Sequence, residues 1–375
     1  MNLLMLSGDS AAAQGQEGPF AALLSRFAAH WARIDILCPP IPAAKPVACR
    51  FGNVYFHAST RRKLAQVAFI RQQGTRLLAE RRYAVITSHD YGIFLNGQGA
   101  RRLARQSGLP WVSELHHVEG YPRAATPRER LYRTLAQRYV RAVRDEVAAF
   151  RVVNQQEMPG FLRALGVPEQ KIHVLPSLYL DFEIFRPGPA VPRYDVLFVG
   201  RLVPNKGLFT LLEALARVKA ARPQVRLAIL GQGPLRAALE KRILGLELTA
   251  NVEFLPPAAD ARAVAHHYRE SRMLVCASTS EGGPRVTVEA MACGVPVIST
   301  PVGVMGDLIV DEENGLLFHW DSAALAARIL RLLGDADLRT RLGTGGQRSV
   351  AHFAATEVIA GYAQGLQRIA AEAAR

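Results

Sequence analysis

Short apolar runs that alternate with amphipathic segments constrain the fold of this chain more than any other feature of its sequence. In the second half we interpret these runs as buried strands: Asp195–Val199, Arg226–Leu230, Asn251–Leu255, Met273–Cys276 and Pro296–Ser299. Segments typical of helices lie between them: Thr210–Ala221, Pro234–Leu244, Arg262–Ser271 and Val286–Ala292. Strands that alternate with helices build parallel sheets covered on both faces. The sequence therefore predicts an α/β fold.

The first half repeats this alternation. Its candidate strands are Asn2–Leu6, Ile34–Cys38, Ala84–Ser88 and Trp111–Leu115, with helices from about Pro19 and over residues 126–148. A chain of 375 residues is too long for one ordinary core, and the Pro- and Gly-rich stretch 185–194 separates the two series. We expect two facing Rossmann-like domains, residues 1–185 and 186–355, and a C-terminal helix, 356–375, that packs back on the first domain. Ligands bind such sheets beyond the carboxyl ends of the strands, so we expect the site in a cleft lined by those loops.

Positive charge is concentrated in the first half of the chain. The net charge is +14, and residues 1–180 hold 24 Lys and Arg against 12 Asp and Glu, whereas residues 181–375 hold 22 against 20. Such an imbalance indicates an anionic partner, either nucleic acid, acidic phospholipid or a phosphorylated substrate. A membrane- or nucleic-acid-binding protein without catalysis is the less favoured alternative, and we expect no nucleic-acid partner because no zinc-finger spacing, RNP motif or aromatic-interleaved basic stretch is present.

A membrane surface is a second way to use this charge. Residues 61–82 combine basic ends with an apolar stripe, as an interfacial helix does; the alternative is a helix that packs on the N-terminal sheet. No apolar run reaches the length of a membrane-spanning helix, and the N-terminus lacks the pattern of a signal peptide. The four cysteines form no CxxC pair or metal-ligand spacing. We therefore expect a cytoplasmic protein, with possible peripheral contact at the inner face of the cell membrane.

Two cations follow one of the predicted strands. In VGRLVPNKG, residues 199–207, a strand ends at Gly200, and Arg201 and Lys206 flank the turn before the next helix. A guanidinium can bind two phosphate oxygens at once and an ammonium adds a mobile charge, so this turn can hold a diphosphate. The alternative is a solvated turn with ordinary surface cations.

Two carboxylates follow another predicted strand in EGGPRVTVEA, residues 281–290. Glu281 is followed by Gly283 and Pro284 in a turn, and Glu289 lies in the helix that begins there, in an uncharged setting. The free N–H groups of a helix start favour an anion. Carboxylates accept hydrogen bonds from sugar hydroxyls, and such partners offset the cost of burying them. The alternative is a capping carboxylate plus a surface glutamate.

Together these motifs resemble the donor site of the GT-B glycosyltransferases, specifically the large retaining family 4, or glycosyl transferases group 1. The similar residues are GRLVPNKG followed by EGGPRVTVEAMACGVPVI, with weaker matches in LAILGQGPLRAALE, NGLLF and KIHVLPSLYLDFEIFRP. The resemblance implies transfer of a hexose from a UDP- or GDP-linked sugar, with retention of configuration and without a metal or other cofactor. The first domain would bind a saccharide or lipid-linked glycan acceptor, in bacterial cell-surface polysaccharide biosynthesis.

The resemblance also implies roles for individual residues. Arg201 and Lys206 would hold the donor diphosphate, Glu289 the ribose and Glu281 the transferred sugar, with Gly283 and Pro284 framing it. In the first domain these residues would face the donor sugar or acceptor: His116, the loop glycine Gly15, and further acceptor contacts at Glu114, His117 and Glu119. The segment Ser177–Asp181 is one residue longer than the family pattern, and Gly283 stands where an aromatic residue is common.

Two other enzyme classes share parts of this pattern. GQGPLR follows a strand, as in a nicotinamide-linked dehydrogenase, but the dinucleotide fingerprint needs a glycine where Arg236 stands. A nucleotide-sugar epimerase that hydrolyses its substrate has the same architecture. Retention through a covalent intermediate would need a carboxylate nucleophile at the anomeric carbon, and the sequence identifies no such residue. We therefore expect attack by the acceptor hydroxyl on the face that the phosphate leaves, with Arg201 and Lys206 stabilising the leaving diphosphate.

Overall fold

The computed structural model describes residues 1–41, 49–59 and 65–373, which divide into two units. Unit 1 comprises Met1–Val118, Tyr132–Ser177 and Thr356–Arg375, and unit 2 comprises Glu119–Leu131 and Leu178–Ala355. After Glu119–Leu131 the chain enters unit 2 a second time at Leu178, earlier than the boundary expected after residue 185, because Leu180 and Phe185 are buried in the core of unit 2. We describe each unit by itself.

Unit 1 is built on an eight-stranded sheet with the order β3-β4-β2-β1-β5-β6-β7-β8 among the described residues. Its strands are β1 (Asn2–Leu6), β2 (Arg33–Cys38), β3 (Cys49–Arg50), β4 (Val54–Ala58), β5 (Val85–His89), β6 (Trp111–Glu114), β7 (Ala149–Val152) and β8 (Ile172–Val174). All neighbours pair in parallel except β3 and β4. The chain order reverses at β1, which pairs with β2 on one side and β5 on the other.

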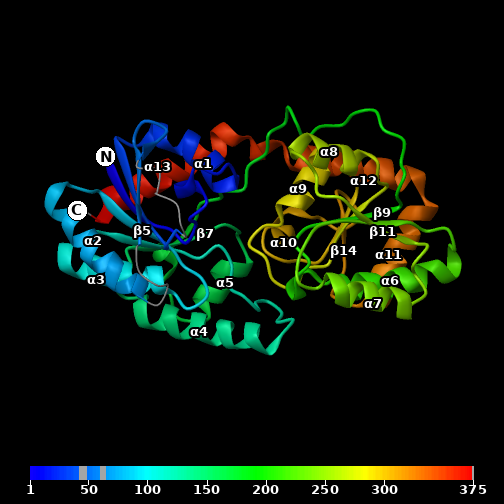
Figure 1. Ribbon diagram of the computed structural model, residues 1–375, viewed down its shortest axis with the longest axis horizontal. Helices are drawn as coiled ribbons and strands as arrows, with labels where there is room; N and C mark the ends of the chain where they lie inside the picture. The colour runs from blue at the N-terminus through cyan, green and yellow to red at the C-terminus, as the bar shows by residue number, and fades with distance from the viewer. Residues whose placement is uncertain (42–48, 60–64, 374–375) are drawn as a thin grey trace. The chain divides into compact units, whose positions relative to one another are not determined.

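Helices cover both faces of this sheet (Figure 1). They are α1 (Pro19–Phe27), α2 (Gln66–Glu80), α3 (Leu95–Ser107), α4 (Pro127–Val143), α5 (Glu157–Arg163) and the C-terminal α13 (Ala355–Ala373). In Figure 1, α1 and α13 lie on one face and α2, α3 and α4 on the other. The rings of Phe27 on α1 and Tyr362 on α13 stack with centroids 4.7 Å apart, so the end of the chain is part of the core of unit 1.

Helix α2 buries the apolar stripe that we considered for membrane contact. Val67, Ile70 and Leu77 are buried, and α2 packs closely on α3, where a Cβ on Gly99 would lie 2.7 Å from the Ile70 side chain. The packed-helix alternative therefore describes α2, because its apolar face is already covered by protein. The basic residues 61–63 at the start of that segment lie outside the described residues.

Unit 2 contains a six-stranded parallel sheet with the order β11-β10-β9-β12-β13-β14 in the part of the chain described. The strands are β9 (Val196–Val199), β10 (Leu227–Leu230), β11 (Val252–Leu255), β12 (Leu274–Cys276), β13 (Val297–Ser299) and β14 (Leu316–Leu317). Here the chain order reverses at β9, between β10 and β12. Each strand of the second half predicted from the sequence is present and one residue shorter at its start.

The helices of unit 2 also form two layers. They are α6 (Leu208–Ala221), α7 (Arg236–Gly245), α8 (Ala261–Arg269), α9 (Arg285–Ala292), α10 (Met305–Leu308), α11 (Ser322–Gly334) and α12 (Ala336–Ser349). In Figure 1, α6, α7 and α11 lie on one face of the sheet and α8, α9 and α12 on the other. Asp260, Asp321 and Asp335 begin α8, α11 and α12, and each accepts a hydrogen bond from a backbone N–H of the first turn. The apolar residues of each layer then form two clusters, one on each face of the sheet.

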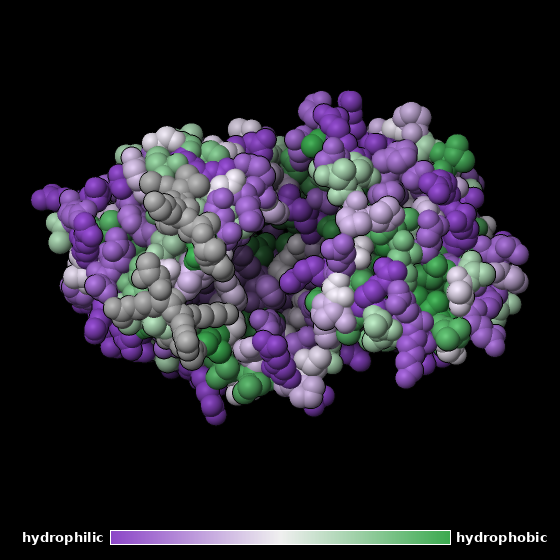
Figure 2. Space-filling model, viewed as in Figure 1, coloured by the Kyte–Doolittle hydropathy of each residue, from purple (hydrophilic) through white to green (hydrophobic). Residues whose placement is uncertain are grey.

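Hydrophilic side chains predominate on the face shown in Figure 2. Large exposed hydrophobic residues occur in both units, among them Tyr91 in unit 1 and Val310 in unit 2. No helix of the described residues combines the length and the apolar character needed to cross a bilayer.

Candidate functional site

The loops after β9 and β12 meet at the edge of the unit 2 sheet where the strand order reverses. Thr279 donates its backbone N–H to the carbonyl of Asn205 at 2.8 Å, and the Asn205 amide donates to the carbonyl of Ser280 at 3.0 Å. Ligands of open parallel sheets bind beyond the strand ends at such a reversal. The sheet topology therefore brings the two motifs singled out in the sequence to one place.

Gly207 permits this close approach of the two loops. Its φ is 66°, in the left-handed region, and a Cβ there would lie 2.0 Å from the carbonyl oxygen of Ala277. Any other residue would combine backbone strain with a backbone clash. This physical requirement explains the glycine at the end of VGRLVPNKG.

Lys206 and Glu281 form an ion pair across these loops. Their side chains are only 15% and 17% exposed, and Ser278 Oγ donates to the same Glu281 oxygen at 3.1 Å. Lys206 passes over Gly200, where a Cβ would lie 3.8 Å from the lysine Cε. Arg201 is exposed, and its guanidinium makes no hydrogen bond or ion pair within the described residues. Two cations and one carboxylate therefore lie at the joined ends of β9 and β12.

Helix α9 begins directly after the Gly-rich turn. Pro284 precedes it without a side-chain cap, so the first N–H groups of the helix have no side-chain acceptor there. Gly303 has a φ of 53° and packs directly against this turn. A Cβ added at Gly303 would lie 2.3 Å from the Gly282 carbonyl oxygen. Val304 donates its N–H to that oxygen at 3.1 Å. The helix start is thus available for an anion beside Lys206.

Glu289 is buried one turn into α9. Tyr268 Oη donates to its Oε2 at 2.9 Å, and Oε1 makes no hydrogen bond to any described residue. Burial raises the pKa of Glu289 to about 7, against the opposing effects of the Tyr268 hydrogen bond and the Arg285 cation. A buried carboxyl group with only one oxygen hydrogen-bonded destabilises the fold unless a ligand supplies the missing partner. No contact joins Glu289 to the Lys206 pair within the described residues.

Trp320, Thr300 and Arg123 also support the turn after β12, and the sequence analysis missed all three. Trp320 Nε1 and Thr300 Oγ1 both donate to the Ser278 carbonyl, at 2.8 and 2.6 Å. The Arg123 guanidinium lies 5.6 Å from the centre of the Trp320 ring. None of these residues belongs to a motif that would have revealed it.

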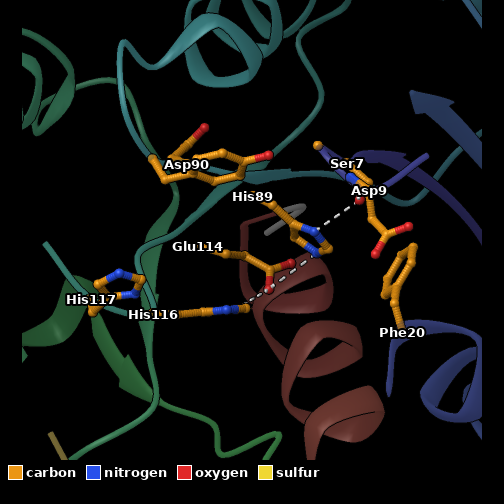
Figure 3. Close-up of a pocket in the computed structure, with 10 residues that line it drawn as sticks. Ser7, Asp9, Phe20, His89, Asp90, Glu114, His116 and His117 are labelled. Carbon is orange, nitrogen blue, oxygen red and sulfur yellow. Dashed lines mark hydrogen bonds and ion pairs between the residues drawn. The ribbon is translucent and has the colours of Figure 1, made fainter. Parts of the chain in front are cut away.

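Unit 1 contains a cavity of about 340 Å³ at its own strand-order reversal. The ends of β1, β5 and β6 supply most of its lining, and Phe20 of α1 adds an aromatic wall (Figure 3). The lining residues are Ser7, Gly8, Asp9, Phe20, His89, Asp90, Tyr91, Glu114, His116 and His117. A cavity of this size suits a small ligand.

The register of the parallel strands gathers charged groups beside this cavity. His89 on β5 pairs with Glu114 on β6, which pairs with Arg151 on β7. Glu114 and Arg151 are each 1% exposed and form an ion pair. Although burial opposes ionisation, Arg151 and the nearby histidines hold the pKa of Glu114 well below its usual range. Glu114, which the resemblance implies as an acceptor contact, lines the cavity and is at the same time bound to Arg151.

His116 lines the cavity close to this ion pair. Its Nε2 lies 2.9 Å from Arg151 Nη1 and 3.6 Å from Glu114 Oε2, and Figure 3 shows His89, Glu114 and His116 facing one another. Burial and the Arg151 cation lower the pKa of His116 to about 4, against the opposing effect of Glu114, although 40% of the side chain is exposed. The histidine is therefore neutral at physiological pH.

Asp90 is a second buried acid of the cavity. Ser88 Oγ, Ser113 Oγ and Tyr139 Oη all donate to its Oδ2, at 2.8, 2.6 and 2.7 Å. Oδ1 is buried without a partner among the described residues, and burial raises the pKa of Asp90 to about 7 despite these donors.

Only some of the residues predicted to contact the donor sugar or the acceptor from the first half of the chain lie at the cavity. His116 and His117 both line the cavity, with His117 pointing away from His89 and Glu114 in Figure 3. Gly15 does not line it; with a φ of 79° it closes a short turn after Ala12–Gln14. Glu119 belongs to unit 2. The strand-end rule that led to His116 would also have found Ser7, Asp9 and His89, but it has no means of finding Arg151 or Tyr362.

Two family models match this chain. Residues 15–177 match the glycosyl transferase 4-like domain and residues 181–349 match glycosyl transferases group 1. D-inositol 3-phosphate glycosyltransferase of Frankia alni is 32% identical over 296 residues, which are 72% of this chain and 70% of that protein. The chain belongs to the glycosyl transferases group 1 family. The enzyme of the same name from Segniliparus rotundus is 30% identical to this glycosyltransferase over 72% of the chain, and the match spans 62% of the relative's own length.

Solved structures confirm the GT-B fold of this glycosyltransferase. Sucrose-phosphate synthase from Thermosynechococcus elongatus has a TM-score of 0.81 at 21% identity, over 99% of both chains. HepE from Anabaena, solved in complex with UDP-glucose, has a TM-score of 0.74 at 20% identity, over 98% of this chain and 100% of HepE. The prediction of two Rossmann-like halves with parallel sheets is therefore confirmed.

Proposed function

We propose that this glycosyltransferase moves a hexose from a UDP- or GDP-linked sugar to a saccharide or lipid-linked glycan, with retention of configuration and without a metal. The observation that carries this proposal is the position of Lys206. It lies with Arg201 and the start of α9 at the joined ends of β9 and β12, where three sources of positive charge converge. A diphosphate is the ligand that such an arrangement suits.

The remaining unit 2 residues fit the other parts of a nucleotide sugar. One carboxyl oxygen of Glu289 accepts a hydrogen bond from Tyr268, and the other remains available to accept from the hydroxyls of a ribose. Glu281 lies beside the cations and would accept from hydroxyls of the transferred sugar, with Gly283 and Pro284 framing that sugar. HepE, which shares the fold, was solved with UDP-glucose.

The chemistry follows from the charges that develop during transfer. The bond between the anomeric carbon and the phosphate oxygen breaks, and an acceptor oxygen bonds to that carbon on the same face. The acceptor proton passes to the departing phosphate, so no protein base is needed. Lys206, Arg201 and the α9 start would stabilise the negative charge on the leaving diphosphate by fixed electrostatics.

The unit 1 cavity favours an uncharged acceptor group. Its described lining contains carboxylates, histidines and aromatic rings, but no Lys or Arg. Several relatives are named for D-inositol 3-phosphate, and a phosphate would need a cation that this lining lacks. We therefore propose a neutral hydroxyl-rich acceptor, which fits a role in cell-surface polysaccharide biosynthesis.

One assay tests these statements together. The enzyme is incubated with UDP- and GDP-hexoses and with neutral sugars, inositol or inositol 3-phosphate, and product configuration is read from NMR couplings of the anomeric proton. We expect an α-linked product from an α-linked donor, formed equally with and without EDTA. Inversion, loss of turnover in EDTA, or preference for inositol 3-phosphate would each remove the corresponding part of the proposal. Free sugar released at full rate without acceptor would instead favour the epimerase or hydrolase alternative.

A further inference from the structure

Arg151 lies beneath the unit 1 cavity and contacts both Glu114 and His116. It is 1% exposed, and its Nε donates to the carbonyl of Leu175 at 2.9 Å. One terminal nitrogen, Nη1, reaches Glu114 Oε2 and also lies 2.9 Å from His116 Nε2. A single buried guanidinium nitrogen therefore has a carboxylate on one side and an imidazole on the other.

The direction of the contact with His116 follows from chemistry alone. Guanidinium nitrogens donate hydrogen bonds and cannot accept them. His116 Nε2 must therefore be the acceptor, which leaves it without a hydrogen. A neutral imidazole then carries its hydrogen on Nδ1, and Nδ1 of His116 makes no hydrogen bond to any described residue.

We propose that Arg151 is a positioning residue that fixes His116 as a neutral, Nδ1-protonated imidazole, so that His116 presents a hydrogen-bond donor to the cavity occupant. His116 then cannot act as a base, because the lone pair of Nε2 is engaged by Arg151 and Nδ1 already carries a hydrogen. The inference rests on the proposed function only for the identity of that occupant, a hydroxyl-bearing sugar whose oxygen would accept from Nδ1.

Arg151 is held in place by residues from two other elements. Glu114 on β6 binds its Nη1, and Tyr362 on α13 donates to both Glu114 oxygens at 3.0 Å while its ring lies 3.7 Å from the guanidinium carbon. The C-terminal helix, 248 positions from Glu114 in sequence, thereby completes the support of a cavity residue.

Burial keeps His116 neutral, and the Arg151 cation acts in the same direction. The titratable groups that face it are Glu114 on β6, Arg151 on β7 and His89 on β5, with Asp9 of the β1 loop acting on His89. Burial and Arg151 oppose a second proton more strongly than Glu114 favours it. Arg151 also polarises the ring through Nε2, which strengthens Nδ1–H as a donor.

Nitrogen-15 NMR of the ligand-free protein tests the tautomer directly. The ring nitrogens of His116 are assigned by their absence from the spectrum of His116→Gln. We expect Nδ1 to resonate as a protonated nitrogen and Nε2 as an unprotonated one, unchanged from pH 8 to about pH 5. A hydrogen on Nε2, or ordinary titration near pH 6.5, would overturn the proposal.

A double variant tests the role of Arg151 itself. Arg151→Met combined with Glu114→Gln removes both buried charges together, so neither is left unpaired. We expect the Nε2-protonated tautomer to become populated, because Nε2 no longer accepts from a guanidinium, while burial still holds the His116 pKa below its ordinary value. The matched control is Arg33→Met with Asp35→Asn, another buried pair of the same sheet, which should leave the His116 signals unchanged.

An unchanged tautomer in the Arg151 double variant would show that Arg151 does not set it. If that variant does not fold, the wild-type spectrum still decides the proposal. Because these signals are read without donor or acceptor, they can fail while transfer activity is present, and hold while it is absent.

Discussion

Lys206 and Glu281 lie 75 positions apart in the sequence and form an ion pair at the ends of neighbouring parallel strands. The Lys206 ammonium is thus already paired with the Glu281 carboxylate. In the proposed donor site, a diphosphate would have to share or displace this ion pair.

Removing the Lys206 cation should weaken the stabilisation of the leaving group. We expect Lys206→Ala to reduce kcat by about 10²–10³-fold, the usual effect of deleting one group that binds developing negative charge. Lys219→Ala is the matched control, because Lys219 on α6 is half-buried and, among the described residues, its ammonium donates only to the Glu247 carbonyl. Steady-state kinetics decide the matter, and equal rates for the two variants would contradict the assigned role.

Replacing the Glu281 carboxylate by an amide should increase nucleotide affinity but lower the turnover rate. Glu281→Gln frees Lys206 from its ion pair, so we expect UDP or GDP to bind about threefold to tenfold more tightly, while turnover falls because the sugar contact is weakened. Isothermal titration calorimetry and kinetics on the same preparation measure both effects. Weaker binding would show that Glu281 does not compete for the lysine.

Glu289 should make donor affinity depend on pH. Its pKa is raised to about 7, so the carboxyl is largely protonated at pH 6 and ionised at pH 8. Hydrogen bonds to a charged acceptor are stronger, and we expect nucleotide-sugar affinity to rise about fivefold across this range.

The nucleotide sugar is the suitable ligand because its diphosphate is esterified at both ends and does not titrate between pH 6 and 8. Glu289→Gln serves as the control, since its amide carries no charge at any pH. A wild-type affinity as flat as that of the variant would contradict the assignment of Glu289 to the ribose.

Asp90 should make stability fall as pH rises. Its folded pKa is raised to about 7 from the ordinary 3.8, so the folded state holds a proton that the unfolded state releases between these values. The resulting stabilisation is complete below about pH 4 and is lost as pH rises through about 7.

We expect Asp90→Asn to remove this component, so that the urea midpoint changes less between pH 5 and pH 8 than in the wild type. Asp145→Asn is the control, because that side chain is 84% exposed. Parallel pH profiles for the wild type and Asp90→Asn would contradict the prediction.

Gly207 should be far less tolerant of a side chain than Gly52. Both have positive φ, 66° and 80°, so alanine strains the backbone by about 1–2 kcal/mol at either position. Only at Gly207 would the Cβ meet a backbone oxygen, at 2.0 Å, whereas nothing lies within 4 Å at Gly52. Gly207→Ala should therefore lose more thermal stability and also weaken donor binding, and equal losses would contradict the clash.

The strands β9 to β13 and the helices between them were predictable because each buries a continuous apolar run or stripe. The short strands β7 and β14 were not, and in β7 the charge of Arg151 interrupts the apolar pattern. The predictions for Arg201, Lys206, Glu281 and Glu289 rest on strand-end motifs, which are local. Arg123 and Trp320 contact the same turn from distant positions, which local patterns do not reveal.

The sequence by itself determined the α/β class, the parallel sheets and the residues that follow β9 and β12, since periodicity and turn chemistry depend on near neighbours in the chain. Only the tertiary structure decided that Arg151 contacts His116 and is itself packed against Tyr362, and that the apolar stripe of α2 faces protein. Strand register and helix packing set these contacts, because they join residues whose separation along the chain carries no local signal.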